Sequence, residues 1–154
     1  MLRTSTSQDT NSVAVVLIQS RSLFLPYAPV AHSESDTRNW IGTSLIPGGG
    51  VVVWEVEDQV VAFIAMSEDD SKSWIDQLYV LPSWTGKGIG HKLLQHAHRV
   101  LPKPIHLYTF EQNLNARRFY ENHGYKAIKF SDGKNNEENC PDILYVLSEH
   151  KTEA

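Results

Sequence analysis

Cysteine is almost absent from this sequence, and so are long apolar runs. Cys140 is the single cysteine among 154 residues, which excludes an internal disulfide and a cysteine-rich zinc site. No run approaches the roughly 20 apolar residues that a membrane-spanning helix needs. The first residues also lack the basic, then apolar, then small pattern of a secretory signal. We therefore expect a cytoplasmic protein with no membrane partner, and at this length one domain that spans residues 1–154.

Basic residues are also in deficit. Lys and Arg number 14 against 18 Asp and Glu, which gives a net charge of −4 at pH 7. No basic stripe is present to neutralise phosphates along a nucleic-acid strand, so we expect no nucleic-acid partner. The histidines do not group either. His91 and His98 are seven residues apart on a predicted helix, but His96 lies off their face, and we expect no metal site.

Three glycines between a predicted strand and a predicted helix are the most informative feature. Residues 74–81 are rich in β-branched and aromatic side chains and are followed by a proline, which predicts a strand. Apolar residues recur at helical spacing across 89–101, which predicts a helix. Gly86, Gly88 and Gly90 lie between the two, where bare backbone and a helix N-terminus make a site for phosphate. The alternative is that the glycines only shape a tight turn, for which one glycine would suffice.

Two common phosphate motifs are absent from this glycine-rich segment. Lys87 is followed by glycine rather than Ser or Thr, and no glycine lies five residues before Gly86, which argues against an ATP-cradling P-loop. The glycines alternate, so the Gly-x-Gly-x-x-Gly fingerprint of dinucleotide-binding proteins also fails. A different phosphate-bearing ligand is therefore expected.

The remaining periodicities predict a mixed α+β fold with helices on both faces of one sheet. Short polar turns join the predicted strands 51–56, 59–66 and 74–80, which favours antiparallel hairpins. The strand 105–110 should lie parallel to 74–80, because a helix crosses over between them. Residues 13–18 are largely β-branched, so a strand stays an alternative to a helix there. The other predicted elements are strands at 2–6, 125–130 and 143–147, and helices at 7–20, 33–45 and 113–124.

Two blocks of the sequence carry a resemblance to a known family. Residues 78–94 contain a pattern close to Gln/Arg-x-x-Gly-x-Gly/Ala after a strand, and residues 113–125 contain Asn-x-x-Ala-x-x-Phe-Tyr-x-x-x-Gly-Tyr. In this order the blocks resemble the GCN5-related N-acetyltransferase (GNAT) superfamily. Thr85 departs from the pattern, since it stands where the family usually has Gln or Arg, and this predicts weaker binding of phosphate. The resemblance implies one GNAT-like domain, whose mostly antiparallel sheet is splayed between two parallel middle strands.

Acetyl-coenzyme A is the cosubstrate that the resemblance implies, bound where the two middle strands separate. Backbone groups of residues 78–81 would pair with the pantetheine arm like an added strand, and amides of residues 85–90 would hold the pyrophosphate. Lys87 and Lys92 would lie near the nucleotide end, and Asn113 would contact the coenzyme from the side. The implied coenzyme-binding residues are Leu78, Tyr79, Val80, Leu81, Thr85, Gly86, Lys87, Gly88, Ile89, Gly90, Asn113 and Tyr120.

Acetyl transfer to an amine also needs a proton for the departing thiolate and a polarised carbonyl. Carried over from the Phe-Tyr pair of the family pattern, Tyr120 is the general acid. A phenol stays protonated near neutral pH and is able to donate. The alternative is that Tyr120 is an ordinary residue of an apolar helix face. We expect the amide of Leu81 to polarise the thioester carbonyl.

The general base is less specified by the sequence. Asp76 is the first candidate, because strand alternation places it on one face with Trp74, Leu78 and Val80. Apolar neighbours would desolvate its carboxylate and make it a stronger base. Glu55 and a water molecule are the alternatives.

Taken together, the sequence predicts an N-acetyltransferase that moves an acetyl group by direct attack to a primary amine of a small molecule or peptide. The acceptor is expected among residues 23–40, 68–70 and 131–142, and a homodimer is compatible with this expectation. Candidate wall residues are Tyr27, Glu34 and Trp40. A non-catalytic acyl-coenzyme A-binding sensor and a site for another phosphate ligand stay open as alternatives.

Overall fold

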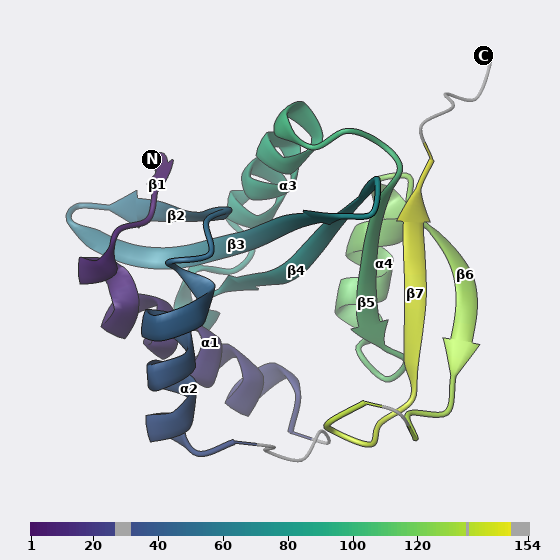
Figure 1. The fold of residues 1–154 in the computed structure, drawn as a ribbon, viewed down its shortest axis with the longest axis horizontal. Coiled ribbons are helices and arrows are strands. Elements are labelled where there is room, and N and C mark those ends of the chain that lie inside the picture. The colour runs from purple at the N-terminus through teal and green to yellow at the C-terminus, as the bar shows by residue number, and fades with distance from the viewer. Residues whose placement is uncertain (27–31, 135, 149–154) are drawn as a thin grey trace.

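A computed structural model describes residues 1–26, 32–134 and 136–148, and these residues form one twisted sheet with helices on both faces (Figure 1). The strands lie in the order β1-β2-β3-β4-β5-β7-β6, and β4 and β5 are the parallel neighbours among antiparallel ones. The mixed, mostly antiparallel sheet predicted from the sequence is confirmed. The bounds are β1 Leu2–Thr4, β2 Val51–Val56, β3 Gln59–Asp69, β4 Lys72–Val80, β5 Ile105–Phe110, β6 Lys126–Ser131 and β7 Asp142–Leu147.

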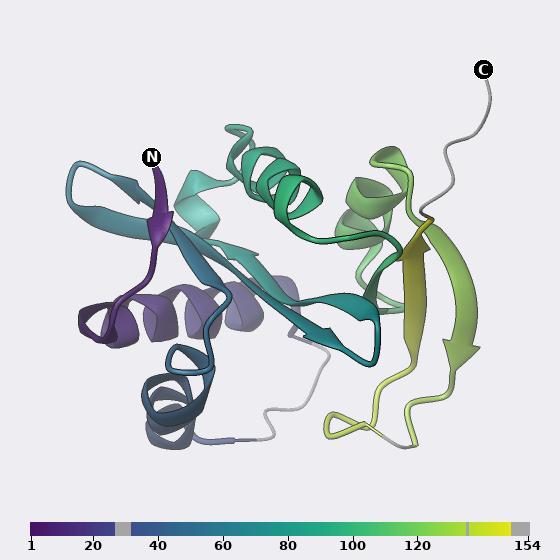
Figure 2. The same cartoon turned by 45° about the horizontal axis from the view of Figure 1, so that its top comes forward.

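Helices cover the sheet in two pairs, with α1 and α2 on one face and α3 and α4 on the other (Figures 1 and 2). Their bounds are α1 Thr10–Phe24, α2 Glu34–Trp40, α3 Ile89–Val100 and α4 Leu114–Asn122. A short 3-10 helix, Ser7–Asp9, precedes α1, and a π-helical turn, Ile41–Leu45, continues α2. None of the helices within the described ranges is long and apolar enough to cross a membrane.

The strand alternative for residues 13–18 is wrong, because this segment lies inside α1. Val13, Val16, Leu17 and Ser20 are buried at helical spacing against the sheet. A β-branched run has no strong local preference, and burial of one helical face decides the outcome here. The strand beneath shows the complementary pattern, since β3 is buried without interruption over residues 60–66. Such a run is expected of a central strand that is covered on both faces.

The sheet is split between its two parallel strands. β4 and β5 pair only at Ser73 with Ile105 and at Trp74 with His106, and then separate. Just beyond this point β4 carries a β-bulge, because Ala65 of β3 lies opposite Gln77 while Met66 lies opposite Ile75, which leaves Asp76 as the extra residue. A bulge bends its strand and increases the local twist, which turns β4 away from β5. The predicted splay of the sheet is confirmed.

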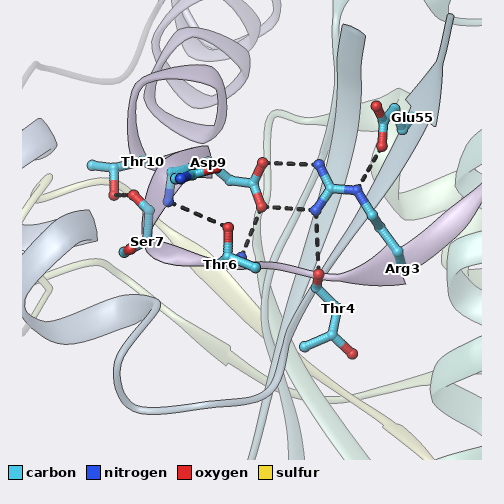
Figure 3. A network of polar contacts seen from close by, with 8 residues as sticks. Arg3, Thr4, Thr6, Ser7, Asp9, Thr10 and Glu55 are labelled. Atoms are coloured by element: carbon cyan, nitrogen blue, oxygen red, sulfur yellow. Dashed lines mark hydrogen bonds and ion pairs between the residues drawn. The ribbon is translucent and has the colours of Figure 1, made fainter. Parts of the chain in front are cut away.

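A polar network fastens the N-terminal strand to the rest of the sheet (Figure 3). The Arg3 guanidinium donates two hydrogen bonds of 2.9 Å to the carboxylate of Asp9 and one of 2.5 Å to Glu55 of β2. The backbone N–H of Thr6 also donates to Asp9, at 2.8 Å. The network therefore joins β1 and the start of α1 to β2, which lies far from both in the chain.

Candidate active site

The glycine turn leads directly into α3 with its backbone exposed. Gly86 and Gly88 have φ of +78° and +83°, a region that other residues rarely adopt. Gly88 is the N-cap of α3 and offers no side chain to the helix, and the first helical bond runs from the N–H of Lys92 to the carbonyl of Gly88. The N–H groups of residues 89–91 thus have no partner within the helix and carry the positive end of its dipole.

Side chains around this turn differ in what they offer to a phosphate. Thr85 Oγ1 donates to the carbonyl of Pro82 at 2.9 Å, so its hydroxyl proton is already engaged. Lys87 is exposed and lies 6.0 Å from the ring centroid of Trp84, and Lys92 is exposed one turn further along the helix. Ile89 is buried in the core, so only its backbone faces outward. The structure thus leaves the amides and two lysines for an anion.

The free edge of β4 is narrower than the sequence predicted. The N–H of Leu81 donates to the carbonyl of Val61 at 2.8 Å, so Leu81 pairs with β3. Backbone groups alternate along an antiparallel ladder, and Phe63 lies opposite Tyr79, so Tyr79 also faces β3 while Leu78 and Val80 face the split. The prediction that the Leu81 amide polarises a thioester is therefore wrong. Leu78 and Val80 remain as the backbone groups that an added strand could use.

The backbone carbonyl of Val80 already has a hydrogen-bond partner. The carbonyl of Val80 accepts a 3.0 Å hydrogen bond from the hydroxyl of Ser20, which is almost fully buried on α1. This leaves the N–H of Val80 and both backbone groups of Leu78 toward the split. A ligand arm would therefore find three backbone groups along this edge.

Tyr120 lies at the bottom of the split. It belongs to α4, is 8% exposed, and packs edge-on against Phe119 and Tyr125 at 5.2 and 5.6 Å between ring centroids. It also lines a cavity of about 230 Å³ together with residues of β4, β5 and the start of α4. The described residues give its hydroxyl no hydrogen-bond partner. Burial, and to a lesser degree the nearby Tyr79, raise the pKa of this phenol, so it holds its proton at neutral pH.

Asp76 lines the same cavity but not in the surroundings that the sequence predicted. It is exposed, and the bulge breaks the alternation that was to place it with Trp74, Leu78 and Val80. Trp74 stacks on Tyr108 at 5.7 Å. Val80 instead faces α3, where its side chain lies 3.9 Å from the position of a Cβ on Gly90. The shared apolar face is therefore wrong, and a role for Asp76 as base stays a prediction that depends on an exposed carboxylate.

Glu55 is excluded as the alternative base by its position. It binds Arg3 at the outer part of the sheet, on β2, and β3 separates it from β4. Asn113, in contrast, does line the smaller cavity. It is the N-cap of α4 and accepts the N–H of Ala116 on Oδ1 at 3.2 Å, which leaves its amide protons to donate.

A second and larger cavity, of about 700 Å³, adjoins the first. α1, α2, β4 and the loop before β7 form its walls, which include residues of the segments 23–40 and 131–142 that the sequence analysis named for the acceptor. Glu34 and Trp40 line it, whereas residues 68–70 are absent from its described lining. Tyr27 lies outside the described residues. The residues that line both cavities are Arg21, Leu25, Gln77 and Glu138.

Arg21 and Glu138 were missed by the sequence reasoning. Their side chains approach to 3.5 Å where the two cavities meet, and the Arg21 guanidinium lies 5.9 Å from the ring centroid of Phe110. Burial raises the pKa of the adjacent Tyr79, and the charge of Arg21 opposes this shift. The available signal was one cation between Leu17 and Leu25 on a single helical face, where an apolar residue is expected.

The fold and the site together define a mixed α+β protein with a cavity at a break in its sheet. The family described as "Acetyltransferase (GNAT) family" matches residues 17–125. This match covers more than half of the chain, and the chain belongs to the GNAT acetyltransferase family.

Individual proteins resemble the chain in sequence or in fold. The chain is 35% identical over 82 residues to an "Uncharacterized N-acetyltransferase" of Archaeoglobus fulgidus, a match that covers 46% of this chain and 56% of that protein. Apo-form YjaB from Escherichia coli has a similar fold, with a TM-score of 0.76, 22% identity and 96% of each chain covered. The PaiA N-acetyltransferase from Thermoplasma acidophilum, solved in complex with coenzyme A, gives a TM-score of 0.75 at 20% identity, covering 96% of this chain and 98% of that one.

Proposed function

We propose that this protein is an acetyl-coenzyme A-dependent N-acetyltransferase that acts on a primary amine by direct attack. The observation that carries the proposal is the phenol of Tyr120, which is buried, has no partner among the described residues and lines a cavity at the split of the sheet. Family membership and the glycine turn at the start of α3 support the same assignment.

In this proposal each part of the site has one task in holding the coenzyme, which supplies the acetyl thioester. The amides at Gly86–Gly90 and the start of α3 bind the diphosphate, with Lys87 and Lys92 beside it. The three free backbone groups of Leu78 and Val80 pair with the pantetheine arm, so that the arm takes the place of a strand.

The acceptor amine attacks as the free base. Its nitrogen forms the new bond to the acetyl carbon while the bond from that carbon to sulfur breaks. The amine nitrogen loses one proton, to Asp76 or to water, and Tyr120 gives one proton to the departing sulfur. The raised pKa keeps the phenol of Tyr120 protonated at neutral pH, so a proton is present for the departing sulfur.

Substitution of Tyr120 by Phe tests the assignment. General acid catalysis contributes about 10²–10⁴-fold, so Y120F should lose at least about 100-fold in turnover, measured as free thiol released with an amine panel. Coenzyme A should still bind in calorimetry. Tyr145→Phe is the matched control, because this phenol is also buried but bonds to Glu121 and Arg117, away from both cavities. Equal turnover in Y120F and wild type would refute the role of Tyr120.

A non-catalytic acyl-coenzyme A sensor is the second candidate. The observations in its favour are that the Leu81 amide is already bonded and that Thr85 replaces the usual Gln or Arg. A sensor would bind coenzyme A and release no thiol with any amine. Calorimetry with coenzyme A against ATP separates both of these candidates from a site for another phosphate ligand.

A further inference from the structure

The charges that line the two cavities are almost all negative. The described residues of the two linings include six carboxylates, one guanidinium, that of Arg21, and one imidazole, that of His32, which contacts Glu137. The carboxylates are those of Glu34, Asp36, Asp76, Glu137, Glu138 and Asp142. This composition favours a cationic ligand over an anionic or zwitterionic one.

The carboxylates lie in two groups rather than in one. Asp76 and Asp142 line the smaller cavity, which also contains the Tyr120 phenol. Glu34, Asp36 and Glu137 line only the larger cavity, at the start of α2 and in the loop before β7. Glu34 lies 3.8 Å from Arg38 and Glu137 contacts His32, so a ligand amine would join or replace these exposed partners. One group therefore lies where the acetyl group is transferred, and the other lies on the far side of Arg21.

Apolar side chains and one ion pair also line the two cavities. Leu17, Ile18 and Trp40 line the larger cavity, and Leu25 lines both. Arg21 lies at the junction, held 3.5 Å from Glu138 and against the ring of Phe110. A second cation placed beside Arg21 would be repelled, whereas an alkyl chain would gain contact with the apolar wall.

We propose that the acceptor is a small organic dication, with two primary amines joined by an uncharged chain. One amine would lie at Asp76 and Asp142 for acetylation, and the other at Glu34, Asp36 and Glu137. This inference rests on the proposed function. The larger cavity, of about 700 Å³, has the size of a small-molecule site. The buried, unpartnered hydroxyl of Tyr120 is an independent mark of a ligand at the inner end.

A panel of probes with one chain length tests this proposal. Hexylamine, diaminohexane and aminohexanoate share the reacting amine and differ only at the other end, and their kcat/KM is measured by thiol release. Because the carboxylates of Glu34, Asp36 and Glu137 are exposed, each adds little, and together they should favour diaminohexane over hexylamine by about fivefold to tenfold. Aminohexanoate should be the poorest of the three. The preference should fall as salt is raised, because exposed charges are screened.

A double variant tests whether carboxylates of the larger cavity bind the second amine. Glu34→Gln with Asp36→Asn should remove most of the preference for diaminohexane, measured as the ratio of its kcat/KM to that of hexylamine. Glu57→Gln with Asp58→Asn is the matched control, since it removes the same charge from the β2–β3 turn, outside both linings. Glu137→Gln provides a single change in the loop before β7, should the double variant fail to fold.

The outcomes separate the two claims. Equal kcat/KM for hexylamine and diaminohexane, or a preference for aminohexanoate or for a lysine peptide, would overturn the dication and leave the acetyltransferase standing. No thiol release with any amine, despite coenzyme A binding, would overturn the proposed function. In that case calorimetry with coenzyme A present tests whether the protein prefers a dication. Diaminohexane must bind more tightly than hexylamine, and equal binding would refute the preference.

Discussion

Gly88→Ala separates the cost of a strained backbone from the loss of a phosphate site. A Cβ on Gly88 would meet no atom within 4 Å, so no steric clash follows from the substitution. The φ of +83° remains, and a left-handed conformation costs an alanine about 1–2 kcal/mol. Alanine also lowers the entropy of the unfolded chain by about 0.4–1 kcal/mol, so the net loss of stability is about 1 kcal/mol. For this length of chain the melting temperature should fall by about 2–4 °C.

Gly49 provides a control that the chain itself contains. Its φ is +84°, and a Cβ there would also meet nothing within 4 Å, but it lies in the turn after the π-helical segment, away from the glycine turn. Gly49→Ala should therefore lose as much stability as Gly88→Ala. Only Gly88→Ala places a methyl group where the proposed diphosphate approaches the amides, and the loss of one charge-assisted hydrogen bond weakens binding by about 1.5–3 kcal/mol.

Thermal unfolding and calorimetry with coenzyme A measure the two effects separately. The expected result is equal melting temperatures for the two variants and a coenzyme A affinity that falls by about 10-fold or more in Gly88→Ala alone. If both variants bind coenzyme A as the wild type does, the diphosphate does not lie at this turn. If both lose affinity equally, the effect comes from stability and the reasoning about the site is refuted.

Two further predictions concern pH. Arg3 holds the pKa of Asp9 below its ordinary value, chiefly through their hydrogen bonds. The Asp9 carboxylate therefore stabilises the fold above its unfolded pKa of about 3.9. This contribution is lost as the pH falls through the lower pKa that Asp9 has in the folded protein. In urea unfolding, Asp9→Asn should therefore be clearly less stable than wild type at pH 7, and this gap should narrow below pH 4; a gap independent of pH would contradict the ion pair. Burial, aided by the charge of Lys103, lowers the pKa of His98 to about 4. Its imidazole forms a 2.9 Å hydrogen bond with the Tyr125 hydroxyl and should stay neutral between pH 5 and 8. Stability should then decline as pH falls from about 6.5 toward 4, because only the unfolded chain takes up this proton, and an NMR titration of His98 near pH 6.5 would refute the assignment.

Most of the elements follow from local periodicity. The strand 74–80, the glycine turn and the helix that begins at Ile89 have strong local signals, and the structure places them as predicted. Residues 13–18 do not have such a signal, since their β-branched side chains suit a strand as well as a helix. Only the burial of α1 against the sheet decides that this segment is a helix and not a strand.

The details that decide the site are non-local. The bulge at Asp76 is set by the register between β3 and β4, which no alternation within β4 reveals. Likewise the bond from Ser20 to Val80, the bond from Leu81 to Val61 and the contact of Arg21 with Glu138 each join distant parts of the chain. The sequence predicted the strands and helices that meet at the split, but not the place of Arg21 and Glu138 or which backbone groups are already hydrogen-bonded.

The short contact between β4 and β5 has a mechanical consequence. Two residue pairs join the strands there, whereas the neighbouring strands pair along most of their length. The N-terminal four strands and the C-terminal three therefore meet at a narrow seam, and each side carries part of the cavity wall. A molecule that binds between β4 and β5 would contact both halves of the sheet and limit their relative tilt. The shape of the cavity would then depend on whether it is occupied.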